Sequence, residues 1–148
     1  MNSNILSLNI ATKTGWATRT SSGVWNLKTN KGESYGMKHI RFKAKLVELI
    51  KKEEIGLVVY EKPSGRFIKA VSSISELVGV MVNVCEEMGV EYTGYTVGEI
   101  KKHATGKGNC SKSDMVNAAE KEFDVEIIDD NHADALWIYD LGKKLLKS

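Results

Sequence analysis

Apolar and polar residues alternate along residues 4–10, close to the start of the chain. Leu6, Leu8 and Ile10 would face one side of an extended strand, and Asn9 would face the other side. The alternation therefore predicts a strand that carries a polar side chain near its end.

Turns, apolar runs and helical spacing predict the remaining elements. A continuous apolar run is typical of a strand covered on both faces, and capping-box spacing marks two helix starts, at Thr96 and Ser111. The predicted elements are hairpin strands at 15–19 and 23–27, a helix at 36–52, a strand at 57–60, a helix at 68–88, a strand at 90–95, a short helix after 96, a helix at 111–122 and a last helix at 131–147. This order predicts an α/β fold with a mixed five-stranded sheet, an antiparallel hairpin on one side and flanking helices.

The helix at 36–52 has a regular apolar stripe. Its members recur at helical spacing: Met37, Ile40, Ala44, Val47 and Ile50.

Composition narrows the class of protein. The chain has 148 residues, of which 42% are hydrophobic and 27% are charged, and this predicts a single globular domain over residues 1–148. The net charge of +2 does not by itself indicate a nucleic-acid partner.

No apolar run approaches the ~18–20 residues of a membrane span, and signal-peptide features are missing at the start. Cys85 and Cys110 are too few for a disulfide framework or zinc site, so we expect reduced thiols in the cytoplasm.

Glu61 follows directly after the apolar strand at 57–60. In open α/β sheets, binding sites form at the carboxyl ends of the strands. Asn9 lies at a comparable place on the first strand. The alternative for Glu61 is an acid that has simply left the sheet for solvent.

Asp130 and Asp134 are four residues apart, so a helix places both on one face. Two like charges at this spacing repel, and a divalent cation between them would reverse the effect. The alternative is structural, because acids are favoured at helix N-termini by the helix dipole. This preference explains the presence of Asp130 better than that of Asp134, which lies one turn further into the helix. An oxygen-rich cluster of this kind suits Mg²⁺ or Mn²⁺ and is typical of two-metal phosphodiester hydrolysis.

Residues 101–112 are basic and rich in glycine. They include Lys101, Lys102, Lys107 and Lys112, and no acid. Glycines let the backbone approach a phosphate closely, and a helix start offers free N–H groups to an anion. The segment is therefore a candidate DNA-binding site, with a solvated basic loop as the alternative.

Arg66 and Phe67 stand in the loop beyond Glu61. An exposed aromatic side chain there could stack on a base, and the arginine could meet a phosphate. The alternative for Phe67 is a core residue at the start of the next helix.

Four motifs together carry a resemblance to a known family. They are ILSLNIATKTGWA, VVYEKP, EIKKHATGKGNCSKSDMV and DDNHADALWI, and they occur in the family's order over nearly the whole chain. The chain resembles the RuvC-type Holliday junction resolvases, most closely the short phage-encoded versions, within the RNase H-like superfamily. The resemblance implies an RNase H-like fold and a homodimer that binds four-way and other branched DNA junctions and cuts them by paired symmetric nicks, with two Mg²⁺ or Mn²⁺ ions per active site. If phage-encoded, the protein would act in the cytoplasm of the host cell.

The resemblance also implies roles for particular residues. The four metal-binding and catalytic positions fall on Asn9, Glu61, Asp130 and Asp134, with Asn131 or His132 as alternatives to Asp130. Lys101 and Lys112 correspond to lysines that meet the DNA backbone near the scissile phosphate, and Phe67 to an aromatic that stacks at the junction. The helix at 68–88 is the expected dimer surface.

Asn9 departs from the family, which has aspartate at this position. An amide cannot bridge two cations with compensating charge, so we expect the chain to be inactive or weakly active. Since the other motif positions are intact, we interpret Asn9 as an introduced Asp-to-Asn replacement, with natural loss of catalysis as the alternative.

Three other functions compete with a junction resolvase. A non-catalytic junction-binding protein and an RNase H-type or flap nuclease would share the fold. A strand with a Thr- and Gly-rich turn also opens the actin-like phosphotransferases, but these need two such domains around ATP. We therefore expect no nucleotide cofactor and no membrane partner.

Overall fold

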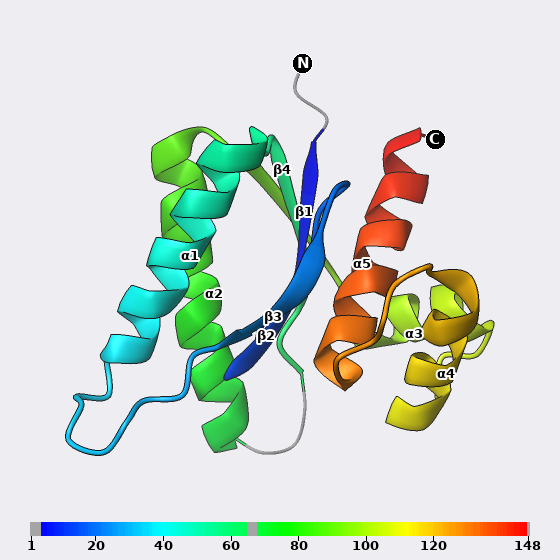
Figure 1. The fold of residues 1–148 in the computed structure, drawn as a ribbon, viewed down its shortest axis with the longest axis horizontal. Coiled ribbons are helices and arrows are strands. Elements are labelled where there is room, and N and C mark those ends of the chain that lie inside the picture. The colour runs from blue at the N-terminus through cyan, green and yellow to red at the C-terminus, as the bar shows by residue number, and fades with distance from the viewer. Residues whose placement is uncertain (1–3, 65–67, 148) are drawn as a thin grey trace.

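The computed structural model describes residues 4–64 and 68–147, so Arg66 and Phe67 lie outside the described residues (Figure 1). The elements are β1 (Ile5–Asn9), β2 (Lys13–Ala17), β3 (Ser22–Asn26), α1 (Met37–Glu53), β4 (Leu57–Glu61), α2 (Ile68–Met88), β5 (Glu91–Tyr95), α3 (Val97–Thr105), α4 (Lys112–Glu122) and α5 (Asp130–Lys147). In this described part of the chain, no helix is both long and apolar enough to cross a membrane.

The strands form one five-stranded sheet in the order β3-β2-β1-β4-β5. β1 pairs antiparallel with β2 and parallel with β4, and β4 pairs parallel with β5. Helices α1 and α2 cover one face, and α3, α4 and α5 lie on the other (Figure 1). The predicted mixed sheet with an antiparallel hairpin is confirmed, and the carboxyl ends of β1 and β4 meet at one edge because these strands are parallel.

Each face of the sheet has its own hydrophobic core. Leu6 and Leu8 of β1 are buried in the core with α1 and α2, whereas Ile5 is buried in the core with α5. The alternation predicted from the sequence is therefore confirmed, and it places Asn9 on the α5 side.

Both predicted capping boxes are present. The Thr96 side chain accepts a hydrogen bond from the Glu99 N–H at the start of α3, and the Ser111 side chain accepts one from the Asp114 N–H at the start of α4. These reciprocal bonds satisfy backbone donors that would otherwise be unpaired, so they fix where the two helices begin.

The apolar stripe that predicted α1 forms only part of the buried side of this helix. Phe42, Leu46, Leu49 and Ile50 are the buried residues of α1, and Ile50 alone belongs to the predicted stripe. Ile40 is 59% exposed. The helix has two apolar stripes at helical spacing, and periodicity cannot tell which of them meets the sheet.

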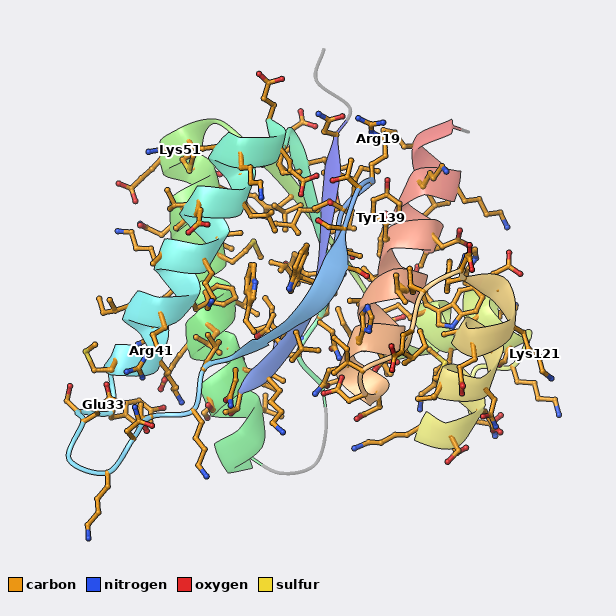
Figure 2. All side chains as sticks on the ribbon, in the orientation of Figure 1. Arg19, Glu33, Arg41, Lys51, Lys121 and Tyr139 are labelled. Atoms are coloured by element: carbon orange, nitrogen blue, oxygen red, sulfur yellow. The ribbon has the colours of Figure 1, made fainter. Side chains whose placement is uncertain are left out.

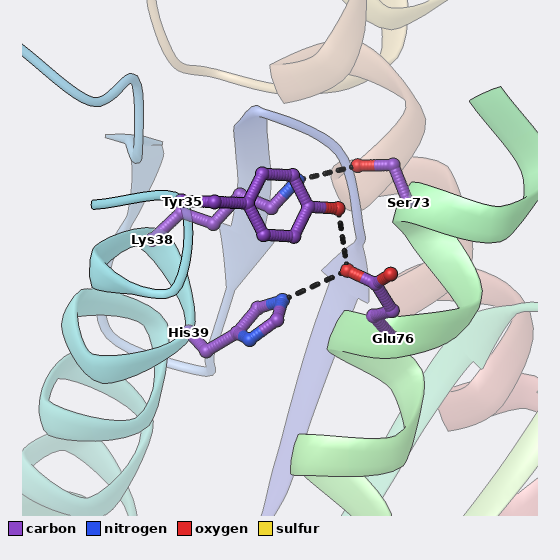
Figure 3. Close-up of polar contacts among 5 residues, drawn as sticks. All are labelled: Tyr35, Lys38, His39, Ser73 and Glu76. Carbon is purple, nitrogen blue, oxygen red and sulfur yellow. Dashed lines mark hydrogen bonds and ion pairs between the residues drawn. The ribbon is translucent and has the colours of Figure 1, made fainter. Parts of the chain in front are cut away.

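Polar contacts join the start of α1 to α2 (Figure 3). Tyr35 donates to Glu76 (Oη–Oε1 2.6 Å), and His39 lies 3.1 Å from the same oxygen. Lys38 donates to Ser73 (Nζ–Oγ 2.7 Å) and lies over the Tyr35 ring. These contacts fix the angle between the two helices at the end near the sheet edge that holds Glu61.

Candidate active site

Asn9, Glu61 and the start of α5 meet at the carboxyl edge of the sheet. Asn9 ends β1, and Glu61 ends the neighbouring strand β4. The Asn9 Nδ2 group donates to Asn131 Oδ1 (3.1 Å) and lies 3.4 Å from Asp134 Oδ2. Residues from opposite ends of the chain therefore form one polar cluster, centred on the position that the sequence singled out.

Two residues that sequence analysis missed bring α5 to this edge. Gly15 pairs with Asn9 across β1 and β2, and a Cβ atom on Gly15 would lie 1.9 Å from the Asn131 carbonyl oxygen. The buried Ser7 hydroxyl donates to the Ala135 carbonyl oxygen (2.7 Å). Only glycine permits so close an approach, and a glycine inside a predicted strand was the signal that could have indicated it.

Burial and like charges raise the pKa values of the acids. Burial raises the pKa of Glu61, and the charge of Lys101 opposes this. The pKa of Asp134 is raised to about 7, first by burial and then by the charges of Glu61 and Asp130, while Lys101 and Lys112 oppose the rise. Five charged groups from four elements thus influence one another, and a cluster of perturbed carboxyl groups is a mark of a functional site.

The predicted DNA-binding lysines differ in their distance from the acids. Lys112 forms an ion pair with Asp130 (Nζ–Oδ2 3.7 Å), and the Lys101 charge reaches Glu61 and Asp134. Lys102 and Lys107 are exposed on the same segment, as contact with DNA would require.

His132 does not belong to the acidic cluster. Its Nδ1 accepts a hydrogen bond from the Ile128 N–H (3.0 Å), and its Nε2 lies 2.8 Å from the Ser22 hydroxyl. Burial lowers the pKa of the ring. Both ring nitrogens are therefore used to join α5 to β3 and to the preceding segment, whereas Asn131 contacts Asn9 directly.

Trp137, less than one turn beyond Asp134, joins the three helices that carry the charged groups. Its indole Nε1 donates to the Met115 carbonyl oxygen of α4 (3.3 Å), and its ring packs edge-on against His103 of α3. His103 also contacts Asp140 of α5 (Nε2–Oδ2 2.8 Å). This partner lies 37 residues further along the chain, so no local pattern indicates the contact.

The donor atoms fit a divalent cation of the Mg²⁺ type in their chemistry, because they are carboxylate and amide oxygens. The raised pKa of Asp134 also fits a cation site. A cation bound nearby would offset the repulsion from Glu61 and Asp130, which is one cause of the raised pKa. Among residues 4–64 and 68–147, however, no three His, Cys, Asp or Glu side chains are grouped so as to hold a metal ion. Within the cluster, Asn9 contributes a neutral amide, which offers one oxygen and no negative charge to a cation.

Comparison with known proteins identifies the class of fold. No protein-family model matches the chain, and no curated protein matches its sequence significantly. The sheet order and the flanking helices are those of the RuvC type of RNase H-like fold.

Particular solved structures share this fold. Thermus thermophilus RuvC aligns with a TM-score of 0.76 and 16% identity over 97% of this chain and 96% of RuvC. T. thermophilus RuvC in complex with a Holliday junction substrate aligns with a TM-score of 0.75 and 17% identity over 91% of this chain and 89% of RuvC. The yeast mitochondrial Holliday junction resolvase Ydc2 aligns with a TM-score of 0.52 and 12% identity over 97% and 81% of the two chains. At these identities the likeness shows the fold.

Proposed function

We propose that this chain is a single-domain, structure-selective DNA endonuclease of the junction-resolving kind, with its catalytic centre held inactive by Asn9. It would bind four-way and other branched DNA as a homodimer and act in the cytoplasm. The main support for the proposal is that Asn9, Glu61 and Asp134 lie together at one edge of the sheet. Lys101 and Lys112 lie beside them. That arrangement, on a RuvC-type fold, combines acids able to bind cations with lysines able to bind a phosphate.

Each residue of the cluster has a definite part in the proposal. With aspartate at position 9, that residue would hold Mg²⁺ or Mn²⁺ together with Glu61, Asp134 and Asp130. Two bound ions would supply an activated water and stabilise the leaving oxygen. Lys101 would hold the phosphate near the acids, and Lys112, which pairs with Asp130, would exchange this partner for the DNA backbone.

Asn9 supports a second candidate, a natural junction-binding protein without nuclease activity. Its Nδ2 group is already hydrogen bonded to Asn131 and lies close to Asp134, so the amide is satisfied without a cation. A nuclease acting on forks, flaps or RNA–DNA hybrids remains the alternative among enzymes.

Cleavage assays distinguish these functions. We expect this chain to bind a labelled four-way junction without cutting it, and Asn9→Asp to cut it in Mg²⁺ or Mn²⁺ with two symmetric nicks. Glu61→Gln in the Asn9→Asp protein is the matched control and should abolish cutting while binding persists. An Asn9→Asp protein that binds junctions and cuts in neither metal would support the non-catalytic binder, and stronger cutting of a fork or an RNA–DNA hybrid would support the other nucleases.

DNA binding has its own test. Because phosphate contacts release counterions, the logarithm of the affinity should fall with the logarithm of the salt concentration, with a slope of about 0.9 for each contact. We expect Lys112→Ala to slow cutting by the Asn9→Asp protein more than it weakens binding. An unchanged cleavage rate would remove Lys112 from the active site.

The exposed face of α2 is the proposed dimer surface. Ser72, Ser75, Gly79 and Asn83 form an exposed stripe of small residues, and a Cβ atom on Gly79 would meet nothing within 4 Å. Small residues let two helices approach closely, and a two-fold axis would pair the stripe with itself. Sedimentation should show a dimer for this chain and a monomer for Gly79→Arg, and a monomer in both cases would refute the surface.

A further inference from the structure

A groove of about 680 Å³ lies away from the acidic cluster, between the β2–β3 turn, the segment 122–128 and α5. Tyr139 and Arg19 stand near one another at the end by the β2–β3 turn (Figure 2). The proposed function uses no residue of this groove, and His132, which contributes to its wall, lies outside the acidic cluster. The volume is within the ~300–1,000 Å³ range of binding sites for small molecules and short segments.

The groove has apolar side chains that the fold leaves uncovered. Ile128 is 63% exposed and Val125 is 44% exposed, and both line the groove. Phe123 and Tyr139 form half-buried parts of the same lining. Isoleucine and valine side chains exposed together in a concave surface are typical of a site for another apolar group.

The backbone beside these side chains also lacks partners. In the described part of the chain, the N–H and C=O groups of residues 124–127 make no hydrogen bond to another residue. Backbone groups of this kind must be satisfied by water or by a bound molecule. A peptide bound along the groove would offer backbone donors and acceptors to these groups.

The charge of the groove excludes DNA as its occupant. Glu122, Asp124 and Glu126 line the groove within five residues of sequence, and together with Asp140 they outnumber the basic lining residues Arg19 and Lys143. Three acids on one segment repel phosphates and attract lysine or arginine. The lysines proposed to bind DNA lie on α3, in the loop after it and at the other end of α4, and none of them lines this groove.

We propose that this groove binds an extended segment of a partner protein, in which large apolar side chains alternate with lysine or arginine. The apolar side chains would cover Ile128 and Val125, the basic groups would pair with Glu122, Asp124 and Glu126, and the peptide backbone would bond to residues 124–127. The inference does not depend on the proposed nuclease function, because it uses none of the acids at the sheet edge.

Fluorescence anisotropy with a labelled peptide of alternating lysine and leucine tests the proposal. We expect saturable binding by this chain, and much weaker binding of a peptide of alternating glutamate and leucine. Ile128→Asp should weaken binding of the lysine peptide by about tenfold or more, because it removes the burial of one isoleucine side chain. Replacing the three acids by Glu122→Gln, Asp124→Asn and Glu126→Gln should weaken it several-fold.

Ile40→Asp is the matched control, since Ile40 is 59% exposed but lies on α1, away from the groove. It should leave peptide binding unchanged, and Ile128→Asp should leave binding of a four-way junction unchanged. The proposal is overturned if the lysine peptide does not bind at concentrations up to about 1 mM, or if Ile40→Asp weakens binding as much as Ile128→Asp does.

Discussion

Replacing Asp134 by asparagine should stabilise the protein at alkaline pH, although it removes a proposed metal ligand. The pKa of Asp134 is raised from 3.8 to about 7 by burial and by the charges of Glu61 and Asp130. Between these two pH values the folded chain keeps a proton that the unfolded chain has released. The unfolded state therefore binds fewer protons, and the stability of the fold falls as the pH rises through this range.

The size of the expected gain in stability follows from the pKa shift of Asp134. Each pKa unit corresponds to about 1.4 kcal/mol, so ionised Asp134 costs the folded state up to about 4 kcal/mol above its folded pKa. Water at the edge of the cluster screens part of this cost, so about 2 kcal/mol is a realistic gain for Asp134→Asn at about pH 8. At about pH 4 the aspartic acid is already neutral in the fold, and the two proteins should be nearly equally stable. The amide oxygen that Asp134→Asn introduces can still accept the hydrogen bond from Asn9.

Urea unfolding at several pH values measures this difference. The gain from Asp134→Asn should grow between about pH 4 and pH 8 and then level off. Asp124→Asn, at an exposed aspartate, is the matched control and should show no such trend. A difference that is independent of pH, or a loss of stability at about pH 8, would refute the assignment of burial and like-charge repulsion as the cause.

Three further changes test how α5 is held. Gly15→Ala should destabilise the fold by about 1–3 kcal/mol, because its Cβ atom would overlap the Asn131 carbonyl oxygen; urea unfolding measures the loss. Ser7→Ala should cost about 0.5–1.5 kcal/mol by removing the buried hydrogen bond to the Ala135 carbonyl oxygen of α5, measured in the same way. Burial lowers the pKa of His132 in the fold, and the charge of Asp129 opposes this, so the unfolded chain takes up a proton more readily below about pH 6.5 and stability falls there; His132→Gln should reduce this acid-side loss in a pH series.

Controls for these changes come from residues with the same chemistry in open places. Gly98→Ala in α3 would meet nothing within 4 Å and should leave stability unchanged or raise it by up to about 1 kcal/mol. Ser72→Ala, at an exposed position, should be close to neutral. Equal losses in the test and control proteins would show that α5 is not held by the contacts described.

Sequence alone determined the order of the elements and the approximate places of the strands, although the predicted hairpin strands at 15–19 and 23–27 lie at Lys13–Ala17 and Ser22–Asn26 in the structure. Alternation predicted β1 and the side on which Asn9 lies, and capping-box spacing predicted the starts of α3 and α4. The order of elements predicted the mixed sheet, whose parallel strands bring Asn9 and Glu61 to the same edge. These features follow from short-range rules, because side-chain direction repeats every two residues in a strand and every 3.6 residues in a helix.

Only the tertiary structure decided how distant elements meet. The family resemblance left Asp130, Asn131 and His132 as candidates for one position of the acidic cluster, and packing turned His132 toward Ser22 while Asn131 came to Asn9. The same applies to α1, where either of two apolar stripes could have faced the sheet. Such choices depend on contacts between residues far apart in sequence, above all the close approach of α5 at a glycine, and no local pattern contains that information. The sequence alone thus predicted that Asn9 ends an apolar strand. The tertiary structure brought acids and lysines from distant parts of the chain close to this residue.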